Sequence, residues 1–229
     1  MSLNLQKVDP ELGQRIHEHL RKQGVETPSR FQVRDTESGI DGISAHFRAI
    51  MEILGLDLSD DSLRGTPERL GRMYMEELFW GLNPSHFPKI TTVTNKMGYD
   101  EMVVEKNIVV HSCCEHHFAM IDGYAHVAYI PDDKVLGLSK INRVVEYFAR
   151  RPQIQERLTE QIYHALAFLL ETPDIAVMIS ARHYCVKSRG VEDINSETLT
   201  SKLGGCFKED PASRQEFLAL ARTRSICSP

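Results

Sequence analysis

Two short runs of metal-binding residue types, far apart in the chain, constrain the fold most. The first is Cys114-Glu-His-His117, and the second is His183-Tyr-Cys185. Zinc favours mixed thiolate and imidazole ligands, and a catalytic zinc site has three protein ligands and leaves the fourth position to water. Cys114, His117 and Cys185 make three, so a fold that brings both runs together would give a water-activating zinc enzyme.

The alternative is that these residues have no metal role. A Cys-x-x-His pair alone is weak evidence, because cysteine is often a buried small apolar residue and histidine often lies on the surface. The second run strengthens the metal interpretation. The chain has five cysteines in all, namely Cys113, Cys114, Cys185, Cys206 and Cys227. An odd number with two adjacent members is a poor disulfide framework and indicates a reduced, cytosolic chain.

Composition excludes several classes of protein. The 229 residues, of which 41% are hydrophobic, suffice for one large domain or one domain with an N-terminal extension. The net charge of -5 argues against nucleic-acid binding, which usually leaves a basic footprint. The chain shows no hydrophobic signal core and no apolar run of transmembrane length. The sequence therefore predicts a soluble, cytoplasmic protein.

The first hundred residues predict helices. A polar helix is expected near residues 10–23, ended by Gly24, and residues 32–39 suggest a linker. Apolar residues then recur at helical spacing between Ile43 and Leu54. Thr66-Pro67 is typical of an N-cap followed by proline, and starts a helix that ends near Gly81.

From about residue 100 the pattern changes to strands and helices. The expected strands are Met102–Val110, Tyr124–Ile130, Ile175–Ile179 and Thr198–Phe207. One helix is expected with Ser139 as its N-cap, another after Pro152, and a short last one after Pro211. The order strand, strand, helix, helix, strand, strand predicts an α+β fold with an antiparallel sheet.

This assignment places the candidate ligands. His183 and Cys185 share parity with the third strand, so we expect both on one face, about 7 Å apart. Cys114 and His117 should lie on the turn after the first strand. The ring of His116 is expected to point elsewhere, where it would handle protons. The alternative for His116 is an exposed neighbour of a ligand.

A second constellation is cationic. Lys140 and Arg143 lie three apart near the helix start at Ser139, on one face. Cations there oppose the helix macrodipole, and a bound anion such as phosphate would resolve the conflict. The alternative is a pair of solvated charges. Three more cations are available, Arg189, Arg69 and Arg72. Together with a zinc-activated water they suggest a nucleotide substrate attacked at its base or sugar.

Four runs in combination resemble the zinc-dependent GTP cyclohydrolase I family. They are Cys114–His117, Gly137–Arg143, Arg151–Leu158 and His183–Gly190, with support from Asn95-Lys-Met and Tyr129-Ile-Pro131. The resemblance covers residues from about 40 to about 222 and leaves the first forty uncovered.

The resemblance implies a fold and an assembly. The fold would be the tunnelling fold, a four-stranded antiparallel sheet with two long helices on one face and an N-terminal helical extension. Its parts would be a variable segment 1–40, a helical part 41–98 and a catalytic part 99–229. Sheets of neighbouring subunits would join into a pentameric barrel, and two pentamers would stack into a homodecamer with active sites at subunit interfaces. A regulatory partner or allosteric ligand is left open.

The resemblance also implies a reaction and the residues that perform it. GTP and water would give 7,8-dihydroneopterin triphosphate and formate, the first step towards folate or tetrahydrobiopterin. Cys114, His117 and Cys185 match the Zn²⁺ ligands, and His116 and His183 match the proton-transfer groups. Glu156, with Gln155 beside it, matches the carboxylate that binds the guanine N–H edge. Ser139, Lys140, Arg143 and Arg189 match the triphosphate site, with Arg69 and Arg72 as contributors.

Three departures and two rival functions belong beside this resemblance. Cys113 is not part of the motif, Arg72 stands where lysine is common, and Ser225–Pro229 extends past the expected end. One rival is another tunnelling-fold enzyme, but a nitrile reductase needs a nucleophilic cysteine without catalytic zinc, and a pyruvoyl-pterin synthase uses three histidines. The other is a zinc-stabilised nucleotide-binding protein without turnover, which would need neither His116 nor His183.

Overall fold

The computed structural model describes residues 3–29 and 36–223 of the chain. Its α-helices are α1 Pro10–Lys22, α2 Thr36–Ile53, α3 Thr66–Arg72, α4 Leu138–Ala149, α5 Gln155–Leu170, α6 Tyr184–Lys187, α7 Gly205–Glu209 and α8 Pro211–Arg222. A π-helical turn, Met73–Leu78, continues α3. Its strands are β1 Thr92–Thr94, β2 Val103–Cys114, β3 Met120–Tyr129, β4 Lys134–Leu136, β5 Pro152–Gln153, β6 Ile175–His183 and β7 Thr198–Leu203.

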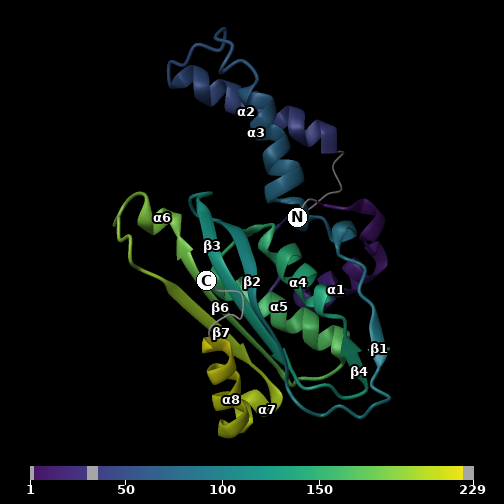
Figure 1. Ribbon diagram of the computed structural model, residues 1–229. Helices are drawn as coiled ribbons and strands as arrows, with labels where there is room; N and C mark the ends of the chain where they lie inside the picture. The colour runs from purple at the N-terminus through teal and green to yellow at the C-terminus, as the bar shows by residue number, and fades with distance from the viewer. Residues whose placement is uncertain (1–2, 30–35, 224–229) are drawn as a thin grey trace.

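An antiparallel sheet forms the centre of the molecule (Figure 1). Its order is β5-β2-β3-β6-β7, and the four long strands pair antiparallel as the sequence predicts. The prediction did not include β5, a two-residue strand that pairs parallel with the end of β2, Cys114 opposite Gln153. A second, two-stranded sheet joins β1 to β4.

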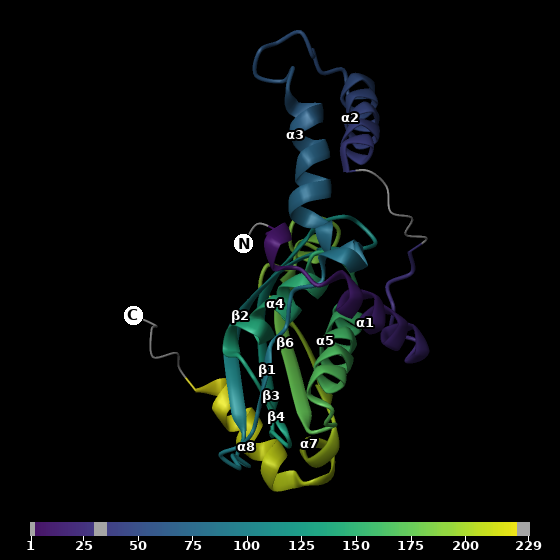
Figure 2. The same cartoon turned by 90° about the vertical axis from the view of Figure 1, so that its right-hand side faces the viewer.

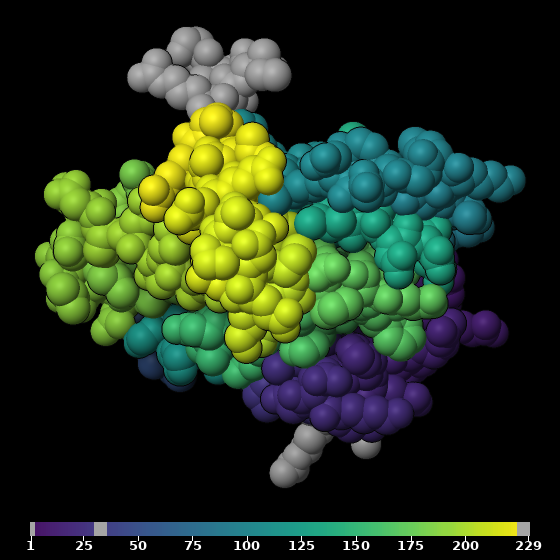
Figure 3. All heavy atoms as spheres, turned by 90° about the horizontal axis from the view of Figure 1, so that it is seen from below, coloured from purple at the N-terminus to yellow at the C-terminus, as the bar shows by residue number. Residues whose placement is uncertain are grey.

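Strand alternation gives the sheet two buried faces. Val127 and Val177 point into the larger core, which α4 and α5 cover. Their neighbours Ala128 and Ala176 point the other way, into a smaller core with Phe217 of α8. Figure 2 shows α4 and α5 on one side of the sheet and α8 on the other, at its lower end. Seen from below in Figure 3, the yellow C-terminal helices lie on the surface of that end. The expected pair of long helices on one face is confirmed.

The N-terminal helix is tied to the core by a buried polar network. Asp9 caps α1 by accepting a hydrogen bond from the Leu12 backbone N–H at 3.0 Å, and Gly24 ends the helix turn with a φ of 71°. Arg151, 2% exposed, donates to Glu26 at 3.2 Å. Gln161 of α5 donates to the backbone carbonyl of Val25 at 2.8 Å. Because these groups are buried and paired, the segment after α1 is fixed against α5.

Helices α2 and α3 pack against each other and stand clear of the sheet (Figure 1). Gly71 of α3 makes this packing close, because a Cβ there would lie 2.3 Å from the Ser44 hydroxyl of α2. The outer positions Ile53 and Leu54 are 84% and 70% exposed. Within the described residues, no helix is long and apolar enough to cross a membrane.

Several predicted boundaries were wrong. Strand β2 runs on to Cys114, and β7 ends at Leu203, where the Gly204 N–H bonds the Ile175 carbonyl at 2.9 Å. Helix α4 starts at Leu138 with Gly137 as its N-cap, so Ser139 lies inside the helix and does not cap it.

The same shift occurs at the start of α3, where Gly65 is the N-cap and Thr66 is already helical. Residues 36–39 of the expected linker are helical, and 32–35 lie outside the described residues, as does the tail 225–229.

Candidate metal centre and active site

A tight turn after β2 holds two of the predicted ligands. Cys114 is the last residue of β2 and is 4% exposed. Its N–H donates to the Ala119 carbonyl at 2.8 Å, and its carbonyl accepts from the Phe118 N–H at 2.9 Å. Phe118 closes the turn in the left-handed region, with a φ of 51°. This closure brings the ring of His117 within 4.0 Å of the Cys114 sulfur, measured from Nδ1.

Cys185 reaches the same place by a route that differs from the prediction. Strand β6 ends at His183, and Tyr184 starts the single helical turn α6. The expected strand parity of His183 and Cys185 therefore does not apply, because a helix turns side chains by about 100° per residue. The helical turn places Cys185 on the side of Cys114 and His117.

Three ligand atoms converge in this way. The sulfurs of Cys114 and Cys185 and a ring nitrogen of His117 all lie within 4.8 Å of one another. Burial raises the pKa of the Cys185 thiol, and the neighbouring Cys114 raises it further. A divalent cation between the two sulfurs would favour their thiolate forms. The donor set and its electrostatics therefore fit a metal ion with three protein ligands, and zinc suits such a set.

His116 lies closer to the cluster than expected. Its Nδ1 is 3.7 Å from the Cys114 sulfur, so the ring does not point away from the ligands. The side chain is 63% exposed, and its Nε2 lies 3.9 Å from the Glu115 carboxylate. His116 thus lies beside the cluster with most of its ring exposed.

An arginine braces the turn from the side of α5. Arg157 donates to both carboxylate oxygens of Glu115, at 2.6 Å from Nη1 and 3.3 Å from Nη2. This hydrogen-bonded pair lowers the pKa of the Glu115 carboxyl, so it stays ionised. The Glu115 backbone N–H also donates to the carbonyl of Gln153 in β5, at 3.0 Å. Glu115 stands between a ligand and His116, so the brace fixes both.

Gln155 holds His183 from beneath. The Gln155 side chain is 1% exposed, and its amide nitrogen faces the carbonyls of Ile179 and Thr198 and the hydroxyl of Thr200. These acceptors fix the amide orientation, so its oxygen faces His183 Nε2 at 2.8 Å. His183 must then carry its proton on Nε2 and present Nδ1 as an acceptor.

Gln155 was expected among the substrate-binding residues beside Glu156. In the structure its amide is hydrogen-bonded to strands β6 and β7 and to His183. Burial lowers the pKa of His183, which keeps the ring neutral near pH 7. A neutral ring with a free Nδ1 is suited to accepting a proton.

Two predicted substrate contacts lie near this centre. Glu156 is exposed at the start of α5, and its carboxylate is close enough to raise the pKa of His183 against the effect of burial. Arg189 is exposed after α6 and lowers the pKa of Cys185 against burial. A carboxylate thus lies near His183, and a guanidinium lies near Cys185.

The other predicted cations are not gathered there by a single chain. Lys140 donates to the Lys89 carbonyl at 3.2 Å, at the far end of α4 from β5. Lys140 precedes Ala149, the end of α4 nearest Cys114, by nine positions, which is about 14 Å along the helix axis at 1.5 Å per residue. Arg143 lies about one turn nearer to Ala149 on the same helix. Ser139 is exposed near the start of α4.

Helix α3 carries the remaining two cations. Arg69 donates to the Thr66 hydroxyl at 2.8 Å, and Arg72 lies 3.7 Å from Glu76.

Arg157 and the positioning role of Gln155 were missed from the sequence. Arg157 is a cation in the first turn of a helix, against the macrodipole, which is the signal that singled out Lys140. The same reasoning predicts an anionic partner for Arg157, and in the structure that partner is Glu115. Nothing in the sequence pattern shows that Gln155 is buried under His183 while its neighbour Glu156 is exposed, and this difference in burial separates their roles.

The fold is mixed α+β, and its Cys-His-Cys cluster could hold a metal ion, with His116 beside it and His183 two residues before Cys185. A model of the family described as GTP cyclohydrolase I matches residues 43–222. The chain is 55% identical over 207 residues to GTP cyclohydrolase 1 of Yersinia enterocolitica, covering 90% of this chain and 94% of that protein. It is 56% identical over 203 residues to GTP cyclohydrolase 1 of Vibrio parahaemolyticus, covering 89% and 94%. The chain belongs to the GTP cyclohydrolase I family.

Proposed function

We infer that the chain is a GTP cyclohydrolase I, a hydrolase that converts GTP and water into 7,8-dihydroneopterin triphosphate and formate. This is the first step of tetrahydrofolate and pterin biosynthesis. The observation that carries the inference is the cluster of Cys114, His117 and Cys185, whose ligand atoms lie within 4.8 Å of one another. Membership of the family supplies the substrate, and the cluster supplies the chemistry.

The metal centre would act on water. Zinc held by the three ligands supplies a Lewis acid that makes water nucleophilic near neutral pH. The chain's own residues position and move protons around it. His183 accepts a proton at Nδ1, because Gln155 occupies its Nε2–H. His116, exposed on the braced turn, is the second proton-transfer group, and imidazole suits both roles.

Substrate binding would use the charged residues around this centre. Glu156 accepts hydrogen bonds from the guanine N–H edge, and its exposure at the start of α5 leaves the carboxylate available. The triphosphate carries several negative charges and would be held by cations. Ser139, Lys140, Arg143 and Arg189 form this group, with Arg69 and Arg72 as contributors.

These cations require more than one chain. Lys140 lies near the start of α4 and Arg143 near its middle, whereas Cys114 pairs with Gln153 beyond the end of α4. This separation supports a triphosphate site that one chain does not complete. We propose that a neighbouring subunit supplies them, with sheets joined into a pentameric barrel and two pentamers in a decamer. The exposed positions Val109 and Tyr124 on the sheet, 51% and 52% exposed, support a covered surface in the assembly.

The test is incubation with GTP, with and without a chelator. Formate is measured together with the fluorescence of the oxidised pterin. Both products should appear, disappear on chelation and return with zinc. Formate without pterin would indicate ring opening without closure, and neither product from a zinc-loaded oligomer would contradict the proposal. Glu156→Ala should reduce discrimination between GTP and ATP, because the guanine N–H edge loses its acceptor.

A further inference from the structure

Four cations gather where the N-terminal segment meets the start of α4. They are Lys7, Lys89, Lys140 and Arg143. The backbone places the first two side by side, because the Lys89 N–H donates to the Lys7 carbonyl at 2.9 Å and Val8 bridges to Pro88. Lys140 reaches the same point by donating to the Lys89 carbonyl at 3.2 Å.

Like charges held this close repel one another. Lys140 is half-buried, and burial together with Arg143, Lys7 and Lys89 lowers its pKa. Among the residues that the structure describes, none of the four forms an ion pair with a carboxylate. The chain as a whole is acidic, with a net charge of -5, so carboxylates are available elsewhere. A group of cations left together in such a chain is typical of an anion site.

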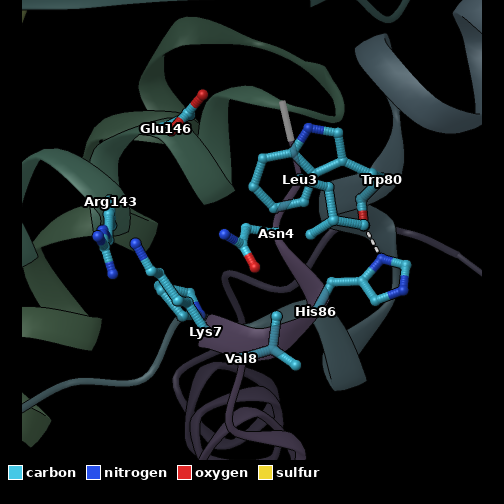
Figure 4. A pocket seen from close by; sticks show the side chains of 9 residues that line it. Leu3, Asn4, Lys7, Val8, Trp80, His86, Arg143 and Glu146 are labelled. Carbon is cyan, nitrogen blue, oxygen red and sulfur yellow. Dashed lines mark hydrogen bonds between the residues drawn. The ribbon is translucent and has the colours of Figure 1, made fainter. Parts of the chain in front are cut away.

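A cavity of about 170 Å³ opens beside this group (Figure 4). Figure 4 shows the amino end of Lys7 and the guanidinium of Arg143 pointing toward each other on one side of it. Glu146 also lines the cavity, but its carboxylate is turned away from Arg143 and lies 3.9 Å from Arg150. Trp80 lines it too, and its buried indole N–H has no acceptor among the described residues.

We propose that Lys7 and Lys89 extend the phosphate-binding surface of Lys140 and Arg143, so that the N-terminal segment helps to hold the triphosphate of the nucleotide. This rests on the proposed function for the identity of the nucleotide. The chemistry it requires is an oligophosphate, since several negative charges in a row match several cations in a row. Lys7 thereby gives the N-terminal segment a role in substrate binding that the family motifs do not assign.

The test uses the full-length protein and the variants Lys7→Met, Lys89→Met and the pair together. Lys22→Met with Lys208→Met is the matched control, because both lysines are exposed, neither has an ion pair within the described part of the chain, and the two substitutions remove the same charge. Sodium tripolyphosphate is titrated by calorimetry at low salt, and KM and kcat for GTP are measured. The Lys7→Arg/Lys89→Arg variant tests whether charge at these positions suffices.

The paired methionine variant should bind tripolyphosphate about tenfold more weakly and raise KM for GTP by a similar factor, with kcat unchanged. The arginine pair should stay near wild type. If the methionine pair matches the control pair in both measurements, the inference is wrong.

The titration needs no turnover, so the two proposals fail separately. A charge-dependent titration in a protein without cyclohydrolase activity would retain the oligophosphate site and reject the proposed function. Normal turnover of GTP, with tripolyphosphate binding unchanged in the Lys7 and Lys89 variants, would support the proposed function and reject the oligophosphate site.

Discussion

The cluster of metal-ligand residue types and the cations predicted to bind phosphate are arranged differently in the chain. The cluster draws Cys114, His117 and Cys185 from two distant parts of one chain and brings their ligand atoms within 4.8 Å. The cations lie apart, Arg72 beside Glu76 on α3 and Lys140 at the far end of α4. One chain therefore gathers the predicted metal ligands, whereas it leaves the predicted phosphate-binding residues apart.

The difference follows from what each part must do. A metal centre needs its ligands placed to a few tenths of an ångström, which paired strands and short turns of a single chain provide. A triphosphate is long and highly charged, so its cations can come from separate elements and separate chains. Under the proposed function, the metal centre depends on the fold of one chain, and triphosphate binding depends on the proposed assembly of several chains.

Loss of a ligand should have the largest effect. Cys185→Ser removes one of the three donors, so zinc content should fall and turnover should drop by about a thousandfold or more. Metal analysis and formate release measure the two. A variant that keeps one zinc per chain would show that Cys185 is not a ligand.

Loss of a phosphate contact should affect binding and leave the metal in place. Arg143→Ala should keep full zinc content and reduce kcat/KM for GTP by about a hundredfold, because a guanidinium that pairs with phosphate makes strong charge-assisted hydrogen bonds. Steady-state kinetics and metal analysis on the same preparation check both parts. Loss of zinc in this variant would contradict the separation of the metal cluster from the cations.

The brace between Arg157 and Glu115 should act on the reactive centre without touching the substrate. Arg157→Met should lower kcat by about tenfold with little change in KM, because the turn carrying His116 and His117 loses its support. Arg157→Lys should recover part of kcat, since one charged hydrogen bond can form. Arg214→Met on α8 is a control arginine far along the chain. A change confined to KM would place Arg157 in substrate binding instead.

Salt should weaken the cationic region alone. Raising ionic strength from about 0.05 to 0.5 M should increase KM for GTP several-fold while kcat and zinc content stay constant, because exposed charges are screened and bonded ligands are not. KM measured across the salt series tests this. A KM that does not change with salt would mean that the cations contribute little to binding.

The sequence predicted the order of the strands and the convergence of Cys114, His117 and Cys185, because both leave strong local patterns. Alternating apolar residues marked β3 and β6, and the spacing of Cys114 and His117 indicated a turn that could hold an ion. The route to Cys185 was wrong, since apolar alternation cannot reveal that a strand stops at His183 and becomes a helical turn. The convergence was correct although its geometry was not.

Other features depend on contacts between residues far apart in the chain. The hold of Gln155 on His183 requires the carbonyls of β6 and β7, which only the folded sheet brings together. The N-cap of α4 went to Gly137 and not to Ser139 because the chain leaves β4 directly into the helix. Such choices are decided by tertiary structure over local propensity.

Mixing two chains with different defects, assayed at GTP concentrations below KM, tests the central claim most directly. Chains with Cys185→Ser lack the metal centre, and chains with Arg143→Ala lack a phosphate contact. If each site joins one chain's cluster to a neighbour's cations, co-expressed chains should recover about a quarter of wild-type turnover for random pairing. Cys185→Ser mixed with Arg189→Ala is the control and should stay inactive, because Arg189 lies beside Cys185 in the same chain. No recovery in the first mixture would mean that each chain builds its whole site alone.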